Sequence, residues 1–345
     1  MYGVHNMGIL EKIQKFVEYN YYRRKDIIAI IFYGSSKYET NTKDSDIDLL
    51  ILTAKSKCFK GVTYIDNTRI EFFEKNFETI LEEIENIDAS QDNSLLSIFK
   101  NGQLISGDEI TFNYLKEQID FERKIPKYQN SSQISQYLTK IEETNNYFYK
   151  NYFYYNLLDK IRKKYHEERG YASISGQKAP ELYQKRDYAE KYYCLRLPDQ
   201  EFINQFQKAL ENGYDANLLT ILLTKVDYTK EQSTNYQNVN ELMVKCYSTI
   251  VESSINRSIR YLSQNNKNSL NSYYLAVEKI RILYCMINQL NYSIDYFKEE
   301  YDIEFLTLLD KTITHVSIEN ITNLFDFTTK NLDINYKSYK ILDLK

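Results

Sequence analysis

One stretch near the N-terminus constrains the fold and the chemistry of this chain more than any other. The apolar run Ile27–Tyr33 is typical of a buried strand, and Gly34 ends it where the backbone must turn sharply. After a short polar insert, a second apolar strand is predicted from Asp46 to Leu52. The two-residue period of a strand places Asp46 and Asp48 on one face, with Ile47, Leu49 and Ile51 on the other.

Two carboxylates on one strand face repel each other, so the pattern indicates a cation that offsets the repulsion. Magnesium is the candidate, because it takes oxygen ligands and is usually held by one or two carboxylates together with substrate phosphates. The Gly34 strand end beside Asp46 and Asp48 therefore favours a nucleoside triphosphate site. The alternative, a solvated acidic strand entrance, does not explain the glycine-serine turn or the apolar strand that follows.

At these residues the chain resembles the DNA polymerase beta-like nucleotidyltransferase superfamily. The signature of that superfamily is Gly-Ser, a variable insert, and Asp-x-Asp at the start of a strand, and the pairs Gly34-Ser35 and Asp46-x-Asp48 match it. The resemblance implies a third carboxylate on a later strand. Glu71 supplies it, with Glu in place of the commoner Asp.

The resemblance implies transfer of a nucleoside monophosphate from a nucleoside triphosphate to an acceptor hydroxyl, with release of pyrophosphate. ATP is the expected donor. Asp46 and Asp48 are the implied ligands of two magnesium ions, and Glu71 completes the metal on the acceptor side. The residues implied to bind the triphosphate are Gly34, Ser35 and Ser36.

Two further strands are predicted around the site. Asp66-Asn67 separates two β-rich runs by two residues, which favours a tight antiparallel hairpin that carries Glu71 back beside the aspartates. The segment Gly102–Asp108 is bracketed by glycines and is predicted to be an edge strand.

The 345 residues exceed one compact domain of usual size and indicate two. Beyond the predicted edge strand, helical periods dominate, and Pro126 followed by polar residues marks the approximate boundary. We expect an α+β fold: a small mixed β-sheet nucleotidyltransferase domain with flanking helices over residues 1–125, then an all-α helical-bundle domain over residues 126–345. The helical domain is expected to bind the acceptor or a partner and to close over the substrate.

The acceptor is less constrained than the donor. Tyr192–Leu210 is similar to the helical region of aminoglycoside nucleotidyltransferases of the kanamycin type, which implies a small hydroxylated acceptor. A protein or tRNA acceptor, as in relatives from toxin-antitoxin or defence systems, stays open. A further alternative is a helical protein that binds a partner and whose transferase site is catalytically vestigial. The presence of all three carboxylates favours an active enzyme over this alternative.

Composition excludes several other classes. The formal charge of -4 argues against an extended nucleic acid as partner, because such binding relies on clustered Lys and Arg. No signal-peptide core or apolar span of bilayer length is present, so we expect a cytoplasmic protein without a membrane partner. The 4 Cys and 3 His lack the paired spacing of a zinc site.

Phosphoryl transfer also needs cations besides the metals, and the helical domain offers candidates that are individually more typical of a solvated helix face. The basic candidates are Lys160, Arg162, Lys163, Lys164, Lys178, Lys185 and Arg186, and the candidate bases are Glu142, Glu143, Glu167 and Glu168. Arg162 to His166 is similar to the Arg/His motif of helical ribonucleases, but the spacing is too short. We therefore expect His166 at the surface.

Overall fold

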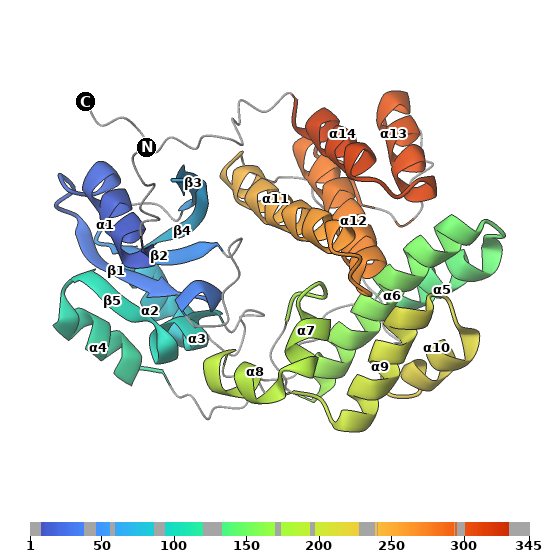
Figure 1. Cartoon of the computed structure of the whole chain (residues 1–345), viewed down its shortest axis with the longest axis horizontal. Helices are drawn as coiled ribbons and strands as arrows, with labels where there is room; N and C mark the ends of the chain where they lie inside the picture. Colours follow the sequence, from blue (N-terminus) through green and yellow to red (C-terminus); the bar gives the residue numbers. More distant parts are fainter. Residues whose placement is uncertain are drawn as a thin grey trace, which may run out of the picture. The chain divides into compact units, whose positions relative to one another are not determined.

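The computed structural model describes residues 8–37, 46–55, 59–85, 94–119, 133–169, 174–193, 197–227, 239, 241–292, 294 and 301–330. The chain divides into two compact units, and the principal division falls between Arg123 and Lys124 (Figure 1). The first unit contains a mixed sheet with flanking helices, and the second is helical. The expected fold class is confirmed.

The first unit is built on a five-stranded sheet with the order β3-β4-β2-β1-β5. β2 and β4 run parallel, and the other neighbouring strands are antiparallel. Both predicted local features are confirmed: β5 is an edge strand, and Asp66 and Asn67 have φ of 46° and 61°, as a tight two-residue hairpin turn requires. The strands are β1 (Ile27–Tyr33), β2 (Ile47–Thr53), β3 (Phe59–Ile65), β4 (Thr68–Asn76) and β5 (Gln103–Gly107).

Helices cover both faces of this sheet. On one face, α1 packs Ile13 and Phe16 against the sheet, and on the other, residues of α2, α3 and α4 pack against Leu50 and Leu52. Because both faces are buried, β1 and β2 are apolar along almost their whole length rather than alternating. The helices of this unit are α1 (Ile9–Asn20), α2 (Phe77–Glu85), α3 (Ser94–Asn101) and α4 (Glu109–Glu117).

The second unit is centred on α12, which packs against α6, α11, α13 and α14. The run Asn271–Glu278 is buried on all sides of this helix, as expected for a helix surrounded by others. The helices are α5 (Ile134–Glu143), α6 (Tyr147–Glu168), α7 (Ala179–Gln184), α8 (Arg186–Tyr193), α9 (Gln200–Asn212), α10 (Ala216–Leu223), α11 (Glu241–Ser263), α12 (Ser269–Ile287), α13 (Ile303–Thr314) and α14 (Ile318–Thr329). Within the described ranges, no helix has the length and apolar character to cross a bilayer.

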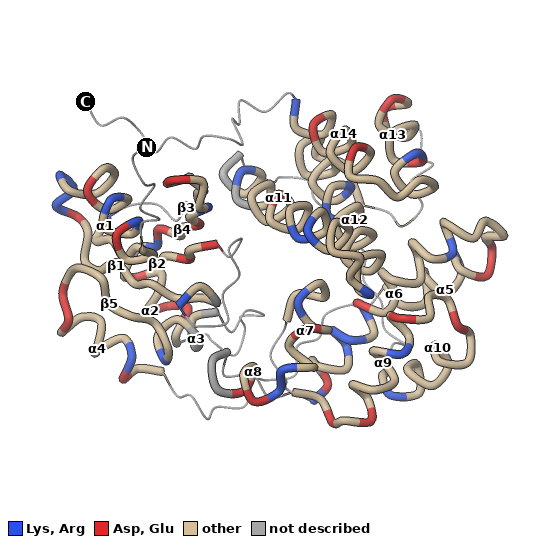
Figure 2. The backbone as a smooth tube through the Cα atoms, in the orientation of Figure 1, with Lys and Arg blue, Asp and Glu red and all other residues tan. Residues whose placement is uncertain are grey.

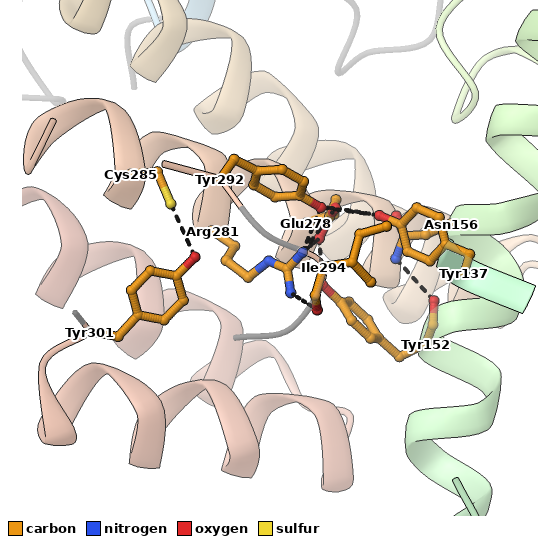
Figure 3. A network of polar contacts seen from close by, with 9 residues as sticks. All are labelled: Tyr137, Tyr152, Asn156, Glu278, Arg281, Cys285, Tyr292, Ile294 and Tyr301. Carbon is orange, nitrogen blue, oxygen red and sulfur yellow. Dashed lines mark hydrogen bonds and ion pairs between the residues drawn. The ribbon is translucent and has the colours of Figure 1, made fainter. Parts of the chain in front are cut away.

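A buried ionic cluster joins α5 and α6 to α12 and the residues after it (Figure 3). Glu278 forms an ion pair with Arg281, with Oε2 and Nη2 3.2 Å apart. The hydroxyls of Tyr137, Tyr152 and Tyr292 all donate to the same carboxylate. Burial alone would raise the pKa of Glu278, but the Arg281 charge and the three hydroxyls hold it below its usual value. The carboxylate is therefore kept charged inside the core.

Candidate active site

The predicted site residues Gly34, Asp48 and Glu71 line up across three adjacent strands. Tyr33 at the end of β1 is the register partner of Asp48 on β2, and Asp48 is the partner of Glu71 on β4. Gly34 follows with φ of 84°, and a Cβ atom there would lie 2.0 Å from Oδ2 of Asp48. Only glycine allows this backbone to turn so close to the aspartate.

Asp46 and Glu71 are held by one guanidinium group. Nη1 of Arg69 donates to Oδ2 of Asp46 at 2.8 Å and also to Oε1 of Glu71. Nζ of Lys60 lies 3.3 Å from the other oxygen of Glu71. The side chain of Glu71 is 12 % exposed and that of Asp46 is 36 % exposed, so the cluster opens toward solvent on the Asp46 side.

These contacts change the interpretation of the acidic cluster. The sequence analysis expected magnesium alone to offset the repulsion between the carboxylates. In the structure, Arg69 and Lys60 pair with these carboxylates and offset part of that repulsion. In the part of the chain that the structure describes, no set of three acidic, His or Cys side chains is arranged to hold a metal ion as it stands. The strand register nevertheless brings Asp48 and Glu71 side by side.

Sequence reasoning missed Arg69 and Lys60. Arg69 lies two residues before Glu71 on the same strand face, so its position next to the third carboxylate was readable from the strand period. The contact between Lys60 and Glu71 could not be predicted from the strand period. Lys60 reaches Glu71 from β3, where its own register partner is Phe73, and only the hairpin register reveals this.

The predicted triphosphate-binding residues lie at the end of β1. Ser35–Lys37 form a single 3₁₀ turn directly after Gly34, and the side chain of Ser36 is buried. The side chain of Ser35 lies outside the described part of the structure. Lys37 is a further cation that the sequence analysis did not consider: its Nζ donates to the carbonyl of Asn101, and burial together with the charge of Lys116 lowers its pKa.

Two expectations for α6 are wrong. Arg162 is fully buried and forms an ion pair with Asp159 at 2.7 Å, so it is part of the core rather than a solvated helix face. His166 is 1 % exposed, and its Nε2 lies 2.7 Å from the hydroxyl of Tyr183. Both errors have the same cause: α6 packs against α5, α9, α12 and α13, so several of its faces are covered.

The other helical-unit candidates are placed as follows. Lys164 pairs with Glu168, Lys185 pairs with Glu181, and Arg186 donates to the carbonyl of Pro198. Of the candidate bases, Glu142 and Glu143 are exposed, Glu168 also accepts from the backbone of Asp227, and the side chain of Glu167 lies outside the described part of the structure. None of these contacts singles out a catalytic base.

The first unit is thus an α+β domain that carries neighbouring carboxylates on two inner strands. Residues 10–129 match the model of the nucleotidyltransferase domain family, which supports a nucleotidyltransferase and is consistent with the polymerase beta-like superfamily. No curated protein matches the chain. The crystal structure of a nucleotidyltransferase-like protein from Exiguobacterium sibiricum 255-15 is 14 % identical, and the match covers 72 % of this chain and 92 % of that one. Its TM-score of 0.30 supports no inference about this chain.

Proposed function

We propose that the N-terminal unit transfers a nucleoside monophosphate from a nucleoside triphosphate, with ATP as the donor, to the hydroxyl of an acceptor. The acceptor oxygen forms a bond to the α-phosphorus, the bond from the α-phosphorus to the bridging oxygen breaks, and pyrophosphate leaves. The observation that supports this is the register of β1, β2 and β4, which aligns Gly34, Asp48 and Glu71 at one place in the sheet.

We assign Asp46, Asp48 and Glu71 as the ligands of magnesium. Their chemistry fits, because carboxylates are the hard oxygen donors that this ion prefers and the strand register places two of them next to each other. When bound, magnesium neutralises the charge on the triphosphate and on the reacting phosphoryl group. Before it binds, Arg69 offsets the charge of Asp46 and Glu71 and orients both side chains.

The remaining groups position the substrate. Gly34 leaves room for phosphate oxygens to approach the backbone at the end of β1, and the turn that contains Ser35 and Ser36 supplies backbone N–H groups there. The acceptor hydroxyl must lose a proton, and Asp48 is the candidate to accept it because it lies at this strand end.

The acceptor that we propose is a small hydroxylated molecule. The similarity of residues 192–210 to aminoglycoside-type enzymes favours it, and the net charge of -4 disfavours a long nucleic acid. Incubation with labelled ATP, GTP, CTP or UTP, magnesium and fractionated cell extract would identify the donor and separate small-molecule products from labelled protein and tRNA.

Substitution of the aspartates tests the assignment of the active site. Asp46→Asn and Asp48→Asn should each lower turnover by about 1,000-fold or more, because an amide removes charge from the metal and from the transition state. The matched control is Asp66→Asn in the hairpin turn, where the side chain is 52 % exposed and Asn tolerates the left-handed backbone. Near-wild-type turnover of either aspartate variant at matched magnesium would exclude the proposed site.

The third ligand is tested separately. Glu71→Gln should retain ATP binding and lose the chemical step, because the carboxylate is assigned to the acceptor side of the reaction. Filter binding of labelled ATP and single-turnover kinetics would measure the two properties independently. An active Glu71→Gln enzyme would move this role to another residue.

A further inference from the structure

Arg69 lies where two of the carboxylates assigned to the metal meet. Figure 2 shows Lys and Arg interspersed with Asp and Glu around β2, β3 and β4. Among them, Nη1 of Arg69 donates to Oδ2 of Asp46 at 2.8 Å and also to Oε1 of Glu71. The side chain of Arg69 is 7 % exposed, so the guanidinium is enclosed within the cluster. One nitrogen atom therefore bridges both carboxylates, and a metal ion held by both would need the same oxygens.

The pairing of β2 with β4 places this arginine beside Asp46. The two strands run parallel, and Ile47 is the register partner of Ile70. Asp46 directly precedes Ile47 in the sequence. Arg69 directly precedes Ile70, so Arg69 and Asp46 lie next to each other where this ladder begins. Glu71 follows two residues after Arg69 on the same face of β4. The strand register itself therefore delivers a cation to the carboxylates.

The charges of the cluster oppose the entry of a further cation. Glu71 is engaged through both oxygens, because Oε1 accepts from Arg69 and Oε2 lies 3.3 Å from Nζ of Lys60. With Asp46 and Asp48 included, the cluster contains three carboxylates and two cations, which leaves one negative charge. Without Arg69 the cluster would carry two negative charges, which a divalent ion neutralises. A metal ion is therefore bound more favourably when the guanidinium is absent.

We propose that Arg69 is an internal competitor of the metal ion: it holds Asp46 and Glu71 in the free protein, and magnesium enters by displacing its guanidinium from both. This inference rests on the assignment of these carboxylates as metal ligands in the proposed function. Displacement breaks charge-assisted hydrogen bonds, which are stronger than neutral ones, so the free protein binds magnesium weakly. The side chain of Asp46 is 36 % exposed, so the ion approaches from the side of this residue.

The competing interpretation is that Arg69 only orients the carboxylates. The two interpretations predict opposite effects of removing the guanidinium. A competitor lowers the affinity for the metal, so its removal should tighten metal binding, whereas the loss of an orienting residue weakens metal binding. The geometry favours competition, because one nitrogen contacts an oxygen of each carboxylate.

Titration of Mn²⁺ into EDTA-washed full-length protein, with free Mn²⁺ measured by electron paramagnetic resonance, tests the proposal without nucleotide or turnover. Mn²⁺ takes the same carboxylate ligands as magnesium. Arg69→Met should lower the Kd for Mn²⁺ by about tenfold or more, because a charge-assisted hydrogen bond no longer competes. Arg69→Lys should stay within about threefold of the wild type, because it keeps the charge. The matched control is Lys15→Met, which removes a cation that pairs with Asp66 at 3.7 Å and should leave the Kd unchanged.

Further substitutions in the Arg69→Met background locate the tighter binding. Addition of Asp46→Asn and Glu71→Gln should abolish it. Circular dichroism at 222 nm shows whether each variant is folded, and Arg69→Gln repeats the titration if Arg69→Met is not. An unchanged or raised Kd in a folded neutral variant overturns the competition, and the metal ligands stay assigned if the carboxylate substitutions remove the binding. Absence of Mn²⁺ binding to Arg69→Met, or binding that survives the loss of both carboxylates, overturns the ligand assignment and the competition with it.

Discussion

Each of the two units holds carboxylates against an arginine, but at different depths. In the strand-end cluster, Arg69 is 7 % exposed and Asp46 is 36 % exposed. In the cluster of the helical unit, Arg281 is 0 % and Glu278 is 7 % exposed. The same pair of functional groups is therefore partly open to solvent in one unit and sealed in the other.

The sealed cluster has little freedom to change partners. Glu278 accepts from three tyrosine hydroxyls and an arginine, so removal of a tyrosine costs the buried carboxylate a hydrogen bond and removal of Arg281 leaves its charge uncompensated. The strand-end cluster differs because the side chain of Asp46 is partly exposed, so solvent reaches one of the two carboxylates that Arg69 holds. Burial therefore distinguishes a sealed ion pair from one that solvent reaches.

The largest effect on stability is expected from Arg281→Met. The substitution leaves the Glu278 charge uncompensated and should lower the free energy of unfolding of the helical unit by about 3–5 kcal/mol. Urea unfolding followed by circular dichroism at 222 nm would measure it. The double variant Glu278→Leu, Arg281→Met should recover part of the loss, and a double variant as unstable as the single one would contradict the account.

An intermediate effect is expected from Arg69→Met. Without the guanidinium, Asp46 and Glu71 repel each other, and the free energy of unfolding in EDTA should fall by about 1–3 kcal/mol. Under the proposed assignment, magnesium then offsets the repulsion, so the rise in Tm on addition of magnesium should be larger for Arg69→Met than for the wild type. A smaller or equal rise would show that the arginine and the metal do not act on the same carboxylates.

The smallest effect is expected from Lys60→Met. Lys60 is 24 % exposed and lies 3.3 Å from Glu71, so its removal should change the free energy of unfolding by less than about 1 kcal/mol. The control is Lys15→Met, because Lys15 pairs with Asp66 at 3.7 Å and both side chains are well exposed. If Lys60→Met lowered the free energy of unfolding as much as Arg69→Met, the proposal that the effect increases with burial would be wrong.

Local features of the first unit could be predicted from the sequence. The strand period, the turn residues Asp66-Asn67 and the glycine at position 34 act over a few neighbouring residues, so the hairpin and the end of β1 were predicted correctly. The contact of Arg69 with both Asp46 and Glu71 depends on the pairing of β2 with β4, which no local pattern specifies. The roles of Asp46, Asp48 and Glu71 remain predictions.

The helical unit was harder to interpret for a physical reason. Asn151–Asp159 is buried at every position, so this part of α6 has no amphipathic stripe that would separate core residues from surface residues. Polar side chains such as Arg162 and His166 are buried there because Asp159 and Tyr183 satisfy them from nearby. A sequence shows that a residue is polar, but it does not show whether the folded core supplies a hydrogen-bond or ion-pair partner for that residue.

The order β3-β4-β2-β1-β5 has a consequence for how this domain can vary and be engineered. The carboxylates Asp48 and Glu71 are carried by the inner strands β2 and β4, whereas Lys60 is carried by β3, an edge strand with one neighbour. Each inner strand is fixed from both sides, so an insertion in the turn at Asp66-Asn67 can be absorbed by a shift of β3 alone. We therefore expect an insertion such as an epitope tag in this hairpin turn to leave the alignment of the carboxylates unchanged.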